Sequence, residues 1–284
     1  MKKRKYIFIF VVVAAVAAGF WIYSQKHGAL DTAAPAMDIS AGQAILIDGD
    51  TGKVLYEKSP DERAYPASTT KIMTALITLE TLERYQSPIK QMVAVPAEAE
   101  GIEGSSLYLK AGEKISIEDL LYGLMLVSGN DAAVALACII GGDQDRFVDM
   151  MNEKASELGC SNTHFINPNG LFDENHYTTV RDMSLIAREA MKHKAFRRIV
   201  ATRDWQAQRE ESTYLTFHNK NKTVHEYKGG TGIKIGYTES SGRTLVASAK
   251  RKGRTMICVV MSAPDWFNDA YRLMDWGFKQ KKEK

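Results

Sequence analysis

The stretch that organises the chain reads Tyr65-Pro66-Ala67-Ser68-Thr69-Thr70-Lys71 and continues into the apolar series Ile72-Met73-Thr74-Ala75-Leu76-Ile77-Thr78-Leu79. Pro66 suits the approach to a helix, because its ring fixes φ near the helical value. No charged residue follows Lys71 until Glu80, so the pattern predicts a helix that is buried on nearly all sides. On such a helix Ser68 and Lys71 share one face, since residues at i and i+3 are neighbours.

A serine beside a buried lysine is a chemically useful pair. Burial lowers the pKa of an ammonium group, and the neutral amine can then take the proton of a nearby hydroxyl. Ser68 would thereby become a nucleophile, and free N–H groups at the helix N-terminus could stabilise an oxyanion. The structural alternative is that Ser68 caps the helix and Lys71 reaches solvent. Spacing alone does not decide, because Ser87-Pro88-Ile89-Lys90 repeats it without an apolar series behind it.

Strand patterns stand at both ends of the folded part of the chain. Five segments fit: Gln43–Asp48, Lys53–Glu57, Gly232–Thr238, Arg243–Lys250 and Thr255–Ser262. Helical patterns fill the middle, and Asp265–Lys279 forms a closing helix. The predicted fold class is α/β in the α+β sense: an antiparallel sheet of about five strands formed by both chain ends, flanked by helices, with a mostly helical lobe inserted.

Residues 1–30 have the composition of a secretion signal or a membrane anchor. A basic start, Met1-Lys2-Lys3-Arg4-Lys5, precedes an uncharged run from Tyr6 to Tyr23. The length of this run lies between those of a signal core and of a spanning helix, so both cleavage and retention remain open, and we favour a retained anchor. In either case the basic flank stays inside and the rest is exported. Residues 31–40 then read as a tether and residues 41–280 as the catalytic domain.

Composition excludes several classes of function. The net charge is only +3 and the basic residues are dispersed, so we expect no nucleic-acid partner. The three cysteines, Cys138, Cys160 and Cys258, allow at most one disulfide, and together with six scattered histidines they show no metal-ligand spacing. We therefore expect no metal and no cofactor.

Two further motifs could complete a site around Ser68. Ser128-Gly129-Asn130 stands in a turn between two apolar helices, where Ser128 could carry a proton and Asn130 could position a substrate amide. Lys234-Ile235-Gly236-Tyr237-Thr238 stands on a strand, where Lys234 could bind a carboxylate and Gly236 permits close backbone approach. Each motif alone is weak, because such turns and strand lysines also occur for structural reasons.

The three motifs in this order resemble the D-alanyl-D-alanine carboxypeptidases, the serine-type, low-molecular-mass penicillin-binding proteins of the β-lactamase and transpeptidase superfamily. The resemblance covers about residues 40–279. Five segments carry it: 68–75, 120–133, 167–171, 232–238 and 275–278. It implies the β-lactamase-like fold and hydrolysis of the terminal D-alanine from peptidoglycan stem peptides.

The resemblance also implies the roles of residues in the chemical steps. Ser68 would attack the peptide carbonyl and form an acyl-enzyme, with Lys71 as its general base. Ser128 would pass a proton to the departing D-alanine. β-Lactam antibiotics would acylate Ser68 in place of substrate.

Substrate binding would fall to a second group of residues. Asn130 would hold the amide on the acyl side, and Lys234 would bind the terminal carboxylate. The backbone N–H groups of Ser68 and Tyr237 would form the oxyanion hole. The implied partners are stem peptides ending in D-Ala-D-Ala, β-lactams and, through the N-terminal segment, the membrane, with the protein at the extracytoplasmic face of the bacterial cell membrane.

The third motif departs from the family pattern, because Ile235 stands where the family has threonine. A lost charge-assisted hydrogen bond to the substrate carboxylate would cost about 1.5–3 kcal/mol. Thr238 shares a strand face with Lys234 and is the candidate to compensate. Two alternatives remain: a peptidoglycan-binding or β-lactam-sensing protein with impaired turnover, and, less favoured, a β-lactamase, for which the chain offers no clear deacylating glutamate between Asn130 and Lys234.

Overall fold

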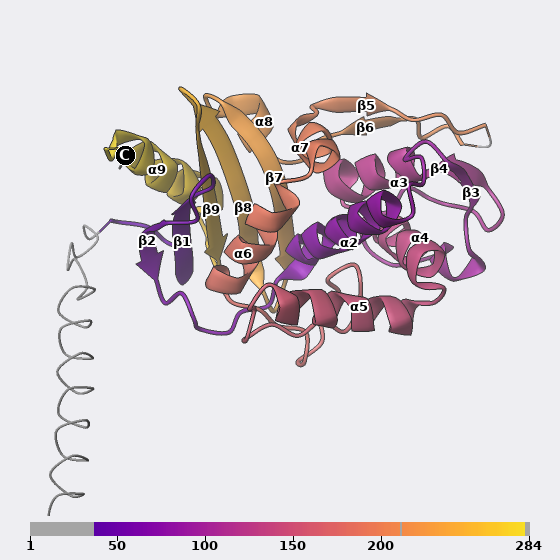
Figure 1. Ribbon diagram of the computed structural model, residues 1–284, viewed down its shortest axis with the longest axis horizontal. Coiled ribbons are helices and arrows are strands. Elements are labelled where there is room, and N and C mark those ends of the chain that lie inside the picture. The colour runs from indigo at the N-terminus through magenta and orange to yellow at the C-terminus, as the bar shows by residue number, and fades with distance from the viewer. Residues whose placement is uncertain (1–36, 211, 282–284) are drawn as a thin grey trace, which may run out of the picture. The chain divides into compact units, whose positions relative to one another are not determined.

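The computed structural model describes residues 37–210 and 212–281 (Figure 1). The segment predicted as a signal or anchor, and most of the predicted tether, lie outside the described residues. Within residues 37–210 and 212–281, no helix is long and apolar enough to cross a membrane.

A five-stranded antiparallel sheet is built from both ends of the described chain. Its strands, in spatial order, are β2 (Val54–Lys58), β1 (Gln43–Asp48), β9 (Arg254–Met261), β8 (Gly242–Arg251) and β7 (Gly230–Thr238). This confirms the predicted sheet. β7 is an edge strand, so one edge of its backbone is not paired within the sheet.

The residues of the sheet alternate between its two faces, as the period of two requires. On β1, Ile45 and Ile47 belong to the main hydrophobic core. Leu46 lies between them in sequence and faces helix α9 (Trp266–Lys279), where a side chain added at Gly277 would meet it. Helix α9 therefore covers one face, and the main core lies against the other.

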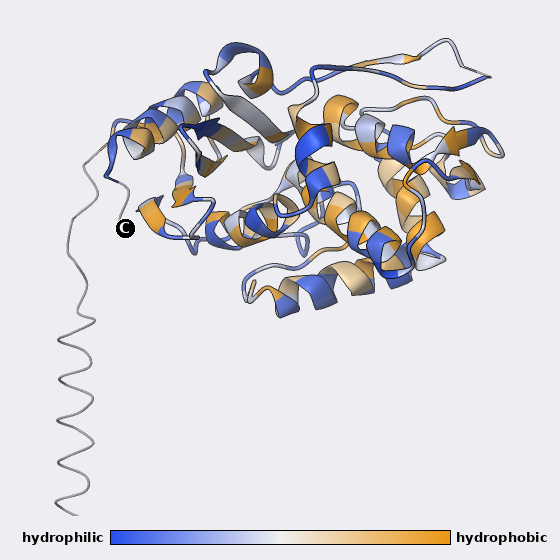
Figure 2. Cartoon of the chain, turned by 45° about the horizontal axis from the view of Figure 1, so that its top comes forward, coloured by the Kyte–Doolittle hydropathy of each residue, from blue (hydrophilic) through white to orange (hydrophobic). Residues whose placement is uncertain are grey.

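The rest of the described chain forms a mostly helical lobe, with hydrophobic residues gathered among its helices (Figure 2). Its α-helices are α2 (Lys71–Arg84), α3 (Ile117–Tyr122), α4 (Asn130–Gly141), α5 (Gln144–Glu157), α6 (Val180–Ala190), α7 (Lys194–Ala201) and α8 (Thr223–Glu226). Short helical turns are η1 (Ala67–Thr70), η2 (Ala97–Ala99) and η3 (Gly123–Val127), and two small hairpins pair β3 (Met92–Ala94) with β4 (Lys114–Ser116) and β5 (Asp204–Gln206) with β6 (Thr216–His218). Helix α2 lies at the centre and packs against α4, α5, α6 and α7.

Local sequence signals explain where several helices begin. The Ser116 hydroxyl accepts a hydrogen bond from the Asp119 N–H at 2.9 Å, and the Thr179 hydroxyl accepts one from the Asp182 N–H at 3.1 Å. Both are N-caps, and each satisfies a backbone donor that has no partner inside the helix. The second Ser-x-x-Lys copy at 87–90 follows the end of α2 and lies in no helix, as predicted.

The compact unit begins at Met37, a few residues before the predicted start of the catalytic domain at position 41. Ile39 is buried, and the Ser40 hydroxyl donates to Asp269 Oδ2 on α9 at 2.7 Å. The Ala41 N–H donates to the same oxygen at 2.9 Å. Asp269 is itself buried, so these hydrogen bonds fix the entry of the chain onto the sheet.

Candidate active site

Ser68 lies in the 3₁₀ turn η1, and Lys71 is the first residue of α2. The prediction of one regular helix across both residues is therefore wrong in detail. A 3₁₀ turn places residues i and i+3 directly above each other, so the pair still shares one face. Helix α2 is buried from Lys71 to Leu79, which confirms the expected buried helix.

Lys71 is completely buried and has three hydrogen-bonding neighbours. Its Nζ lies 2.9 Å from Ser68 Oγ, 2.7 Å from Asn130 Oδ1 and 2.5 Å from the Asn169 carbonyl oxygen. Both carbonyl oxygens only accept, so each takes one N–H of Lys71. A neutral amine then has its lone pair left for the third neighbour, the Ser68 hydroxyl. This arrangement suits Lys71 as the acceptor of the Ser68 proton.

The charge state of Lys71 follows from its surroundings. Burial holds the pKa of Lys71 well below its usual range, and the positive charges of Lys234 and Lys220 lower it further, while Asp131 opposes them. Burial, with a smaller contribution from Lys220, lowers the pKa of Lys234 to about 7. Burial therefore disfavours the charged form of Lys71 strongly, and Lys234, with a pKa of about 7, titrates near neutral pH.

Asn130 is held from two sides at the start of α4. Its Nδ2 donates to the Glu103 carbonyl at 2.7 Å, and its backbone N–H donates to the Ser105 carbonyl at 2.7 Å. Because the amide nitrogen is occupied by Glu103, the amide oxygen faces Lys71. The loop at 103–105 thus fixes the orientation of Asn130.

Ser128 precedes Asn130 in a left-handed conformation, with φ 72° and ψ 31°, at the end of η3. The residue is buried, and η3 packs against both α2 and β7. The second motif is therefore placed between the helix that carries Lys71 and the strand that carries Lys234. The turn that the sequence predicted at 128–130 is confirmed.

Strand β7 passes close to the nucleophile. A Cβ at Gly236 would lie 2.8 Å from the Ser68 nitrogen, which is too close for any side chain. Lys234 is buried and its Nζ donates to the Ile235 carbonyl at 3.0 Å. Tyr237 follows Gly236 and is 63% exposed. The open edge of β7 therefore runs beside Ser68, where an extended substrate could pair with it.

Thr238 does not have a free hydroxyl. Its Oγ1 donates to Ser241 Oγ at 2.8 Å and accepts from the Ser241 N–H at 3.0 Å. These hydrogen bonds close the turn between β7 and β8. The sequence-based proposal that Thr238 replaces the hydroxyl missing at Ile235 therefore requires this turn to rearrange.

Asn169 is a member of the site that the motif analysis did not assign, because its contribution is a backbone carbonyl. The turn around it is fixed by side chains: Thr74 Oγ1 donates to the Pro168 carbonyl at 2.6 Å, and the Gly170 N–H donates to Asn167 Oδ1 at 2.7 Å. Gly170 has no side chain to clash with the Ala67 carbonyl that it touches. The sequence marks only the region, since 167–171 is one of the five segments that carry the family resemblance.

His176 is hydrogen-bonded to the last residue of the turn η1. The Ile166 N–H donates to His176 Nδ1 at 3.1 Å, so the ring proton is on Nε2 and is donated to Thr70 Oγ1 at 2.8 Å. Burial lowers the pKa of His176 to about 4, which keeps the ring neutral near pH 7. Position 176 carries no motif, so sequence reasoning did not identify it.

Lys220 is a third lysine near the site, which the sequence analysis did not assign. Its N–H donates to the Leu126 carbonyl on η3 at 3.1 Å, two residues before Ser128. Much of its side chain reaches solvent, yet partial burial lowers its pKa, and its charge reaches both Lys71 and Lys234. No motif marks Lys220 in the sequence: it stands between Asn219 and Asn221, and only the structure shows that both asparagines are buried.

Comparisons with known proteins agree with this arrangement. The profile of the Peptidase_S11 family, described as D-alanyl-D-alanine carboxypeptidase, matches residues 30–265. The carboxypeptidase DacF of Bacillus subtilis is 38% identical over 243 residues, which are 84% of this chain and 62% of DacF. The D-alanyl-D-alanine carboxypeptidase of Streptomyces sp. strain K15 is 34% identical over 262 residues, covering 87% of this chain and 90% of that protein.

Solved structures show the same fold. The carboxypeptidase DacD from Francisella tularensis superposes with a TM-score of 0.80 at 27% identity, covering 89% of this chain and 73% of that one. A serine-to-alanine mutant of the Streptomyces K15 DD-transpeptidase gives a TM-score of 0.78 at 34% identity, covering 86% of this chain and 100% of that one. On the fold and the family profile together, the chain belongs to the D-alanyl-D-alanine carboxypeptidase family, Peptidase_S11.

Proposed function

We propose that this protein is a serine-type carboxypeptidase that removes the terminal D-alanine from peptidoglycan stem peptides. The observation that carries the proposal is the buried Lys71 Nζ, 2.9 Å from Ser68 Oγ, whose other two neighbours are both hydrogen-bond acceptors. The chain spans 62% of the length of DacF, so the assignment rests on the catalytic unit that the two proteins share.

Acylation begins when Ser68 Oγ attacks the carbonyl carbon of the last peptide bond. Lys71 accepts the hydroxyl proton as the bond forms, which its lowered pKa and its free lone pair permit. The oxyanion receives hydrogen bonds from the backbone N–H groups of Ser68 and Tyr237. Gly236 supports this step, because only a residue without a side chain lets β7 come so close to the Ser68 nitrogen.

Collapse of the tetrahedral intermediate breaks the peptide C–N bond. Ser128 donates its hydroxyl proton to the leaving nitrogen and recovers one from the amine network, so that D-alanine departs and the acyl group stays on Ser68. Asn130, with its amide fixed by Glu103, holds the acyl-side amide of the substrate. A water molecule then attacks the ester, takes the place of D-alanine as acyl acceptor, and frees Ser68. A β-lactam enters the same acylation step.

The substrate carboxylate would be bound by cations. Burial gives Lys234 a pKa of about 7, and an arriving carboxylate would hold it protonated. Lys220 adds a positive charge whose field reaches Lys234 and would offset part of the loss caused by Ile235. This pair, rather than the Thr238 hydroxyl, is the better supported source of carboxylate binding, because Thr238 is already hydrogen-bonded to Ser241.

The place of action follows from the same proposal. Cross-linkable stem peptides lie outside the cytoplasm, and residues 1–30 have the composition that would export the catalytic domain and hold it at the outer face of the membrane.

The test uses a peptide ending in D-Ala-D-Ala and measures free D-alanine. Ser68→Ala should lower release at least ~10⁴-fold, as loss of a nucleophile does. Ser87→Ala is the matched control, because it removes the serine of the second Ser-x-x-Lys copy and should leave release unchanged. A fluorescent penicillin should label the control and not Ser68→Ala. Penicillin labelling of the wild-type chain without release of D-alanine would instead support the alternative function, a peptidoglycan-binding or β-lactam-sensing protein with impaired turnover.

A further inference from the structure

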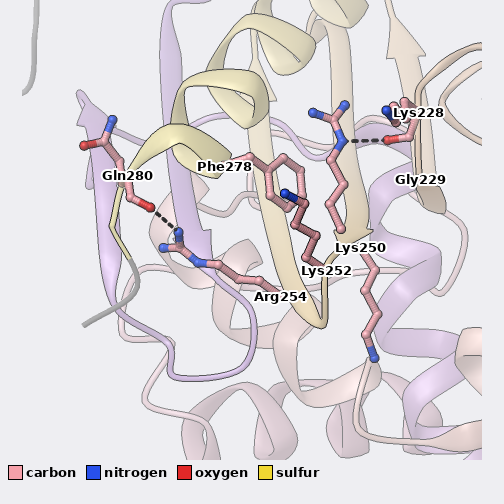
Figure 3. Close-up of a pocket in the computed structure, with 8 residues that line it drawn as sticks. Lys228, Gly229, Lys250, Lys252, Arg254, Phe278 and Gln280 are labelled. Carbon is pink, nitrogen blue, oxygen red and sulfur yellow. Dashed lines mark hydrogen bonds between the residues drawn. The ribbon is translucent and has the colours of Figure 1, made fainter. Parts of the chain in front are cut away.

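A hollow of about 640 Å³ is lined by basic residues (Figure 3). It lies at the end of the β7–β8 pair opposite to the turn that Thr238 closes. It is formed where the β8–β9 turn, the segment before β7 and the end of α9 meet. Its lining includes Lys228, Lys250, Arg251, Lys252, Arg254 and Phe278. None of these residues belongs to the active site described above, so the hollow requires its own explanation.

Two arginines that line the hollow, Arg251 and Arg254, are held in place by hydrogen bonds. Arg251 donates to Asp275 Oδ1 at 2.8 Å and to the Lys228 carbonyl at 2.9 Å, and its guanidinium lies 4.6 Å from the centre of the Phe278 ring. Arg254 is buried and donates to Asp48 Oδ2 at 2.7 Å. Guanidinium groups held this way lose little further freedom when a ligand arrives.

The lysines of the hollow have no such partners. Lys228, Lys250 and Lys252 are exposed, and within residues 37–210 and 212–281 the structure records no ion pair for any of them. The two carboxylates beside the hollow, Asp275 and Asp48, are already used by the arginines. The whole chain carries a net charge of only +3, so this concentration of positive charge is local rather than a property of a basic protein.

We propose that this hollow binds the phosphate group of an anionic ligand. Phosphate is the chemistry that fits, because its oxygens can accept from the ammonium groups of Lys228 and Lys252 and Lys is a common phosphate ligand, whereas the Lys250 side chain points away from these two (Figure 3). Phe278 supplies an apolar surface for the carbon skeleton that carries the phosphate. A soluble glycerol phosphate and the head group of an anionic lipid offer the same group, and the experiment below separates them. The site is independent of the proposed carboxypeptidase activity.

The test compares two charge-matched double variants of the full chain in an uncharged detergent. Lys228→Gln/Lys252→Gln removes two lysines of the hollow. Lys90→Gln/Lys194→Gln removes two exposed lysines of the helical lobe and changes the net charge equally. Glycerol phosphate is titrated into each protein by calorimetry, and mixed micelles containing phosphatidylglycerol are titrated in a second series.

We expect the hollow variant to bind ~25-fold more weakly, about fivefold for each lysine, and the control to bind like wild type. D-Alanine release should be unchanged in both. Binding of soluble glycerol phosphate would show that the hollow binds a free phosphate ester. Binding of the lipid micelles alone would show that it binds the head group of an anionic lipid. No binding of either probe by the wild-type chain, or an equal loss in the control, would overturn the proposal.

Discussion

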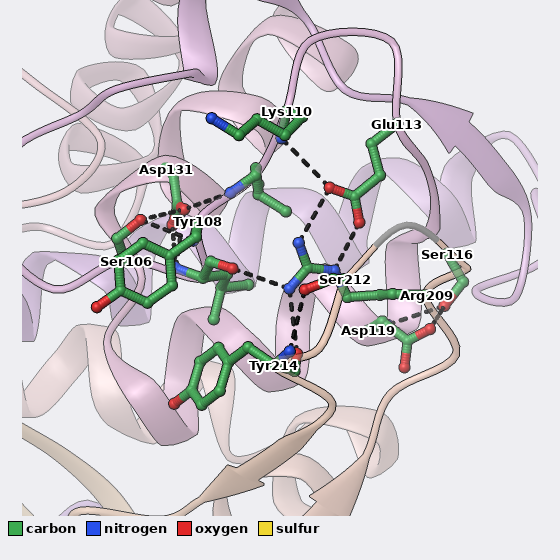
Figure 4. A network of polar contacts seen from close by, with 12 residues as sticks. Ser106, Tyr108, Lys110, Glu113, Ser116, Asp119, Asp131, Arg209, Ser212 and Tyr214 are labelled. Carbon is green, nitrogen blue, oxygen red and sulfur yellow. Dashed lines mark hydrogen bonds and ion pairs between the residues drawn. The ribbon is translucent and has the colours of Figure 1, made fainter.

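Replacing Arg209 by methionine should destabilise the protein strongly, because Arg209 joins two segments through a buried ion pair (Figure 4). Its side chain is 0% exposed and that of Glu113 is 2% exposed. Arg209 Nε lies 2.6 Å from Glu113 Oε1 and Nη2 lies 3.0 Å from Oε2. The same guanidinium donates to the Leu107 carbonyl at 2.8 Å. The pair therefore ties the β5–β6 hairpin to the loop that also holds Asn130.

The size of the effect follows from what Arg209→Met leaves behind. Glu113 would keep a buried carboxylate whose remaining hydrogen-bond partner is the Lys110 N–H at 3.2 Å. Removing one member of a buried pair costs about 3–5 kcal/mol, which is a large share of the roughly 5–15 kcal/mol that typically stabilises a domain. With a urea m-value of about 3 kcal/mol/M, the unfolding midpoint should fall by about 1–1.7 M.

The assay is equilibrium unfolding in urea, followed by tryptophan fluorescence. The double variant Arg209→Met/Glu113→Leu is the decisive comparison, because it removes both charges and should recover most of the lost stability. If the single variant unfolds at the wild-type urea concentration, or if the double variant is as unstable as the single one, the reasoning about the uncompensated buried charge is wrong.

Three further perturbations test other parts of the structure. Ile235→Thr should raise kcat/KM for D-alanine release by about 10- to 100-fold, the equivalent of one charge-assisted hydrogen bond; an unchanged rate would show that the hydroxyl is not needed. Lys220→Gln should move the whole pH profile of kcat/KM to higher pH, because the positive charge of Lys220 lowers the pKa values of Lys71 and Lys234. A profile that stays at the same pH would show that Lys220 does not affect these two pKa values. His176 has a folded-state pKa of about 4, below the ordinary 6.5, so the unfolded chain binds the proton first and stability should fall as pH drops from 6.5 towards 4. Urea midpoints across this range should fall less in His176→Gln, and an equal fall in both proteins would contradict the role given to His176.

The strands and helices were largely predictable because their signals are local. Alternating apolar residues between turns located all five strands of the main sheet. A Ser or Thr three residues before an Asp, as at Ser116 and Thr179, is the local pattern with which α3 and α6 begin. The errors also have local causes. The 3₁₀ turn at Ser68 has the same i, i+3 spacing as an α-helix, so a periodic pattern does not separate the two.

The site was predictable only in part, because its members contribute in different ways. The three motifs placed Ser68, Lys71, Ser128, Asn130 and Lys234 within one arrangement, and their chemical roles stay predictions until the variants are measured. Asn169 acts through a carbonyl oxygen that every residue possesses, so no side-chain signal marks it. Thr238 was assigned from strand periodicity, which gives the face of a side chain but not the turn partner that occupies its hydroxyl.

The sequence by itself determined the elements of this protein and the chemical groups that it offers: a serine and a lysine at helical spacing, an apolar helix behind them, and strands at both ends of the folded chain. Only the tertiary structure decided which lysine has a strongly lowered pKa. The pKa of an amine depends on burial and on charges brought near it from distant segments, and for Lys71 these are Lys234, Asp131 and Lys220. The second Ser-x-x-Lys copy has the same spacing, but its lysine is exposed and follows the end of α2. Spacing therefore supplied the pair at Ser68, and burial among distant residues lowered the pKa of its lysine.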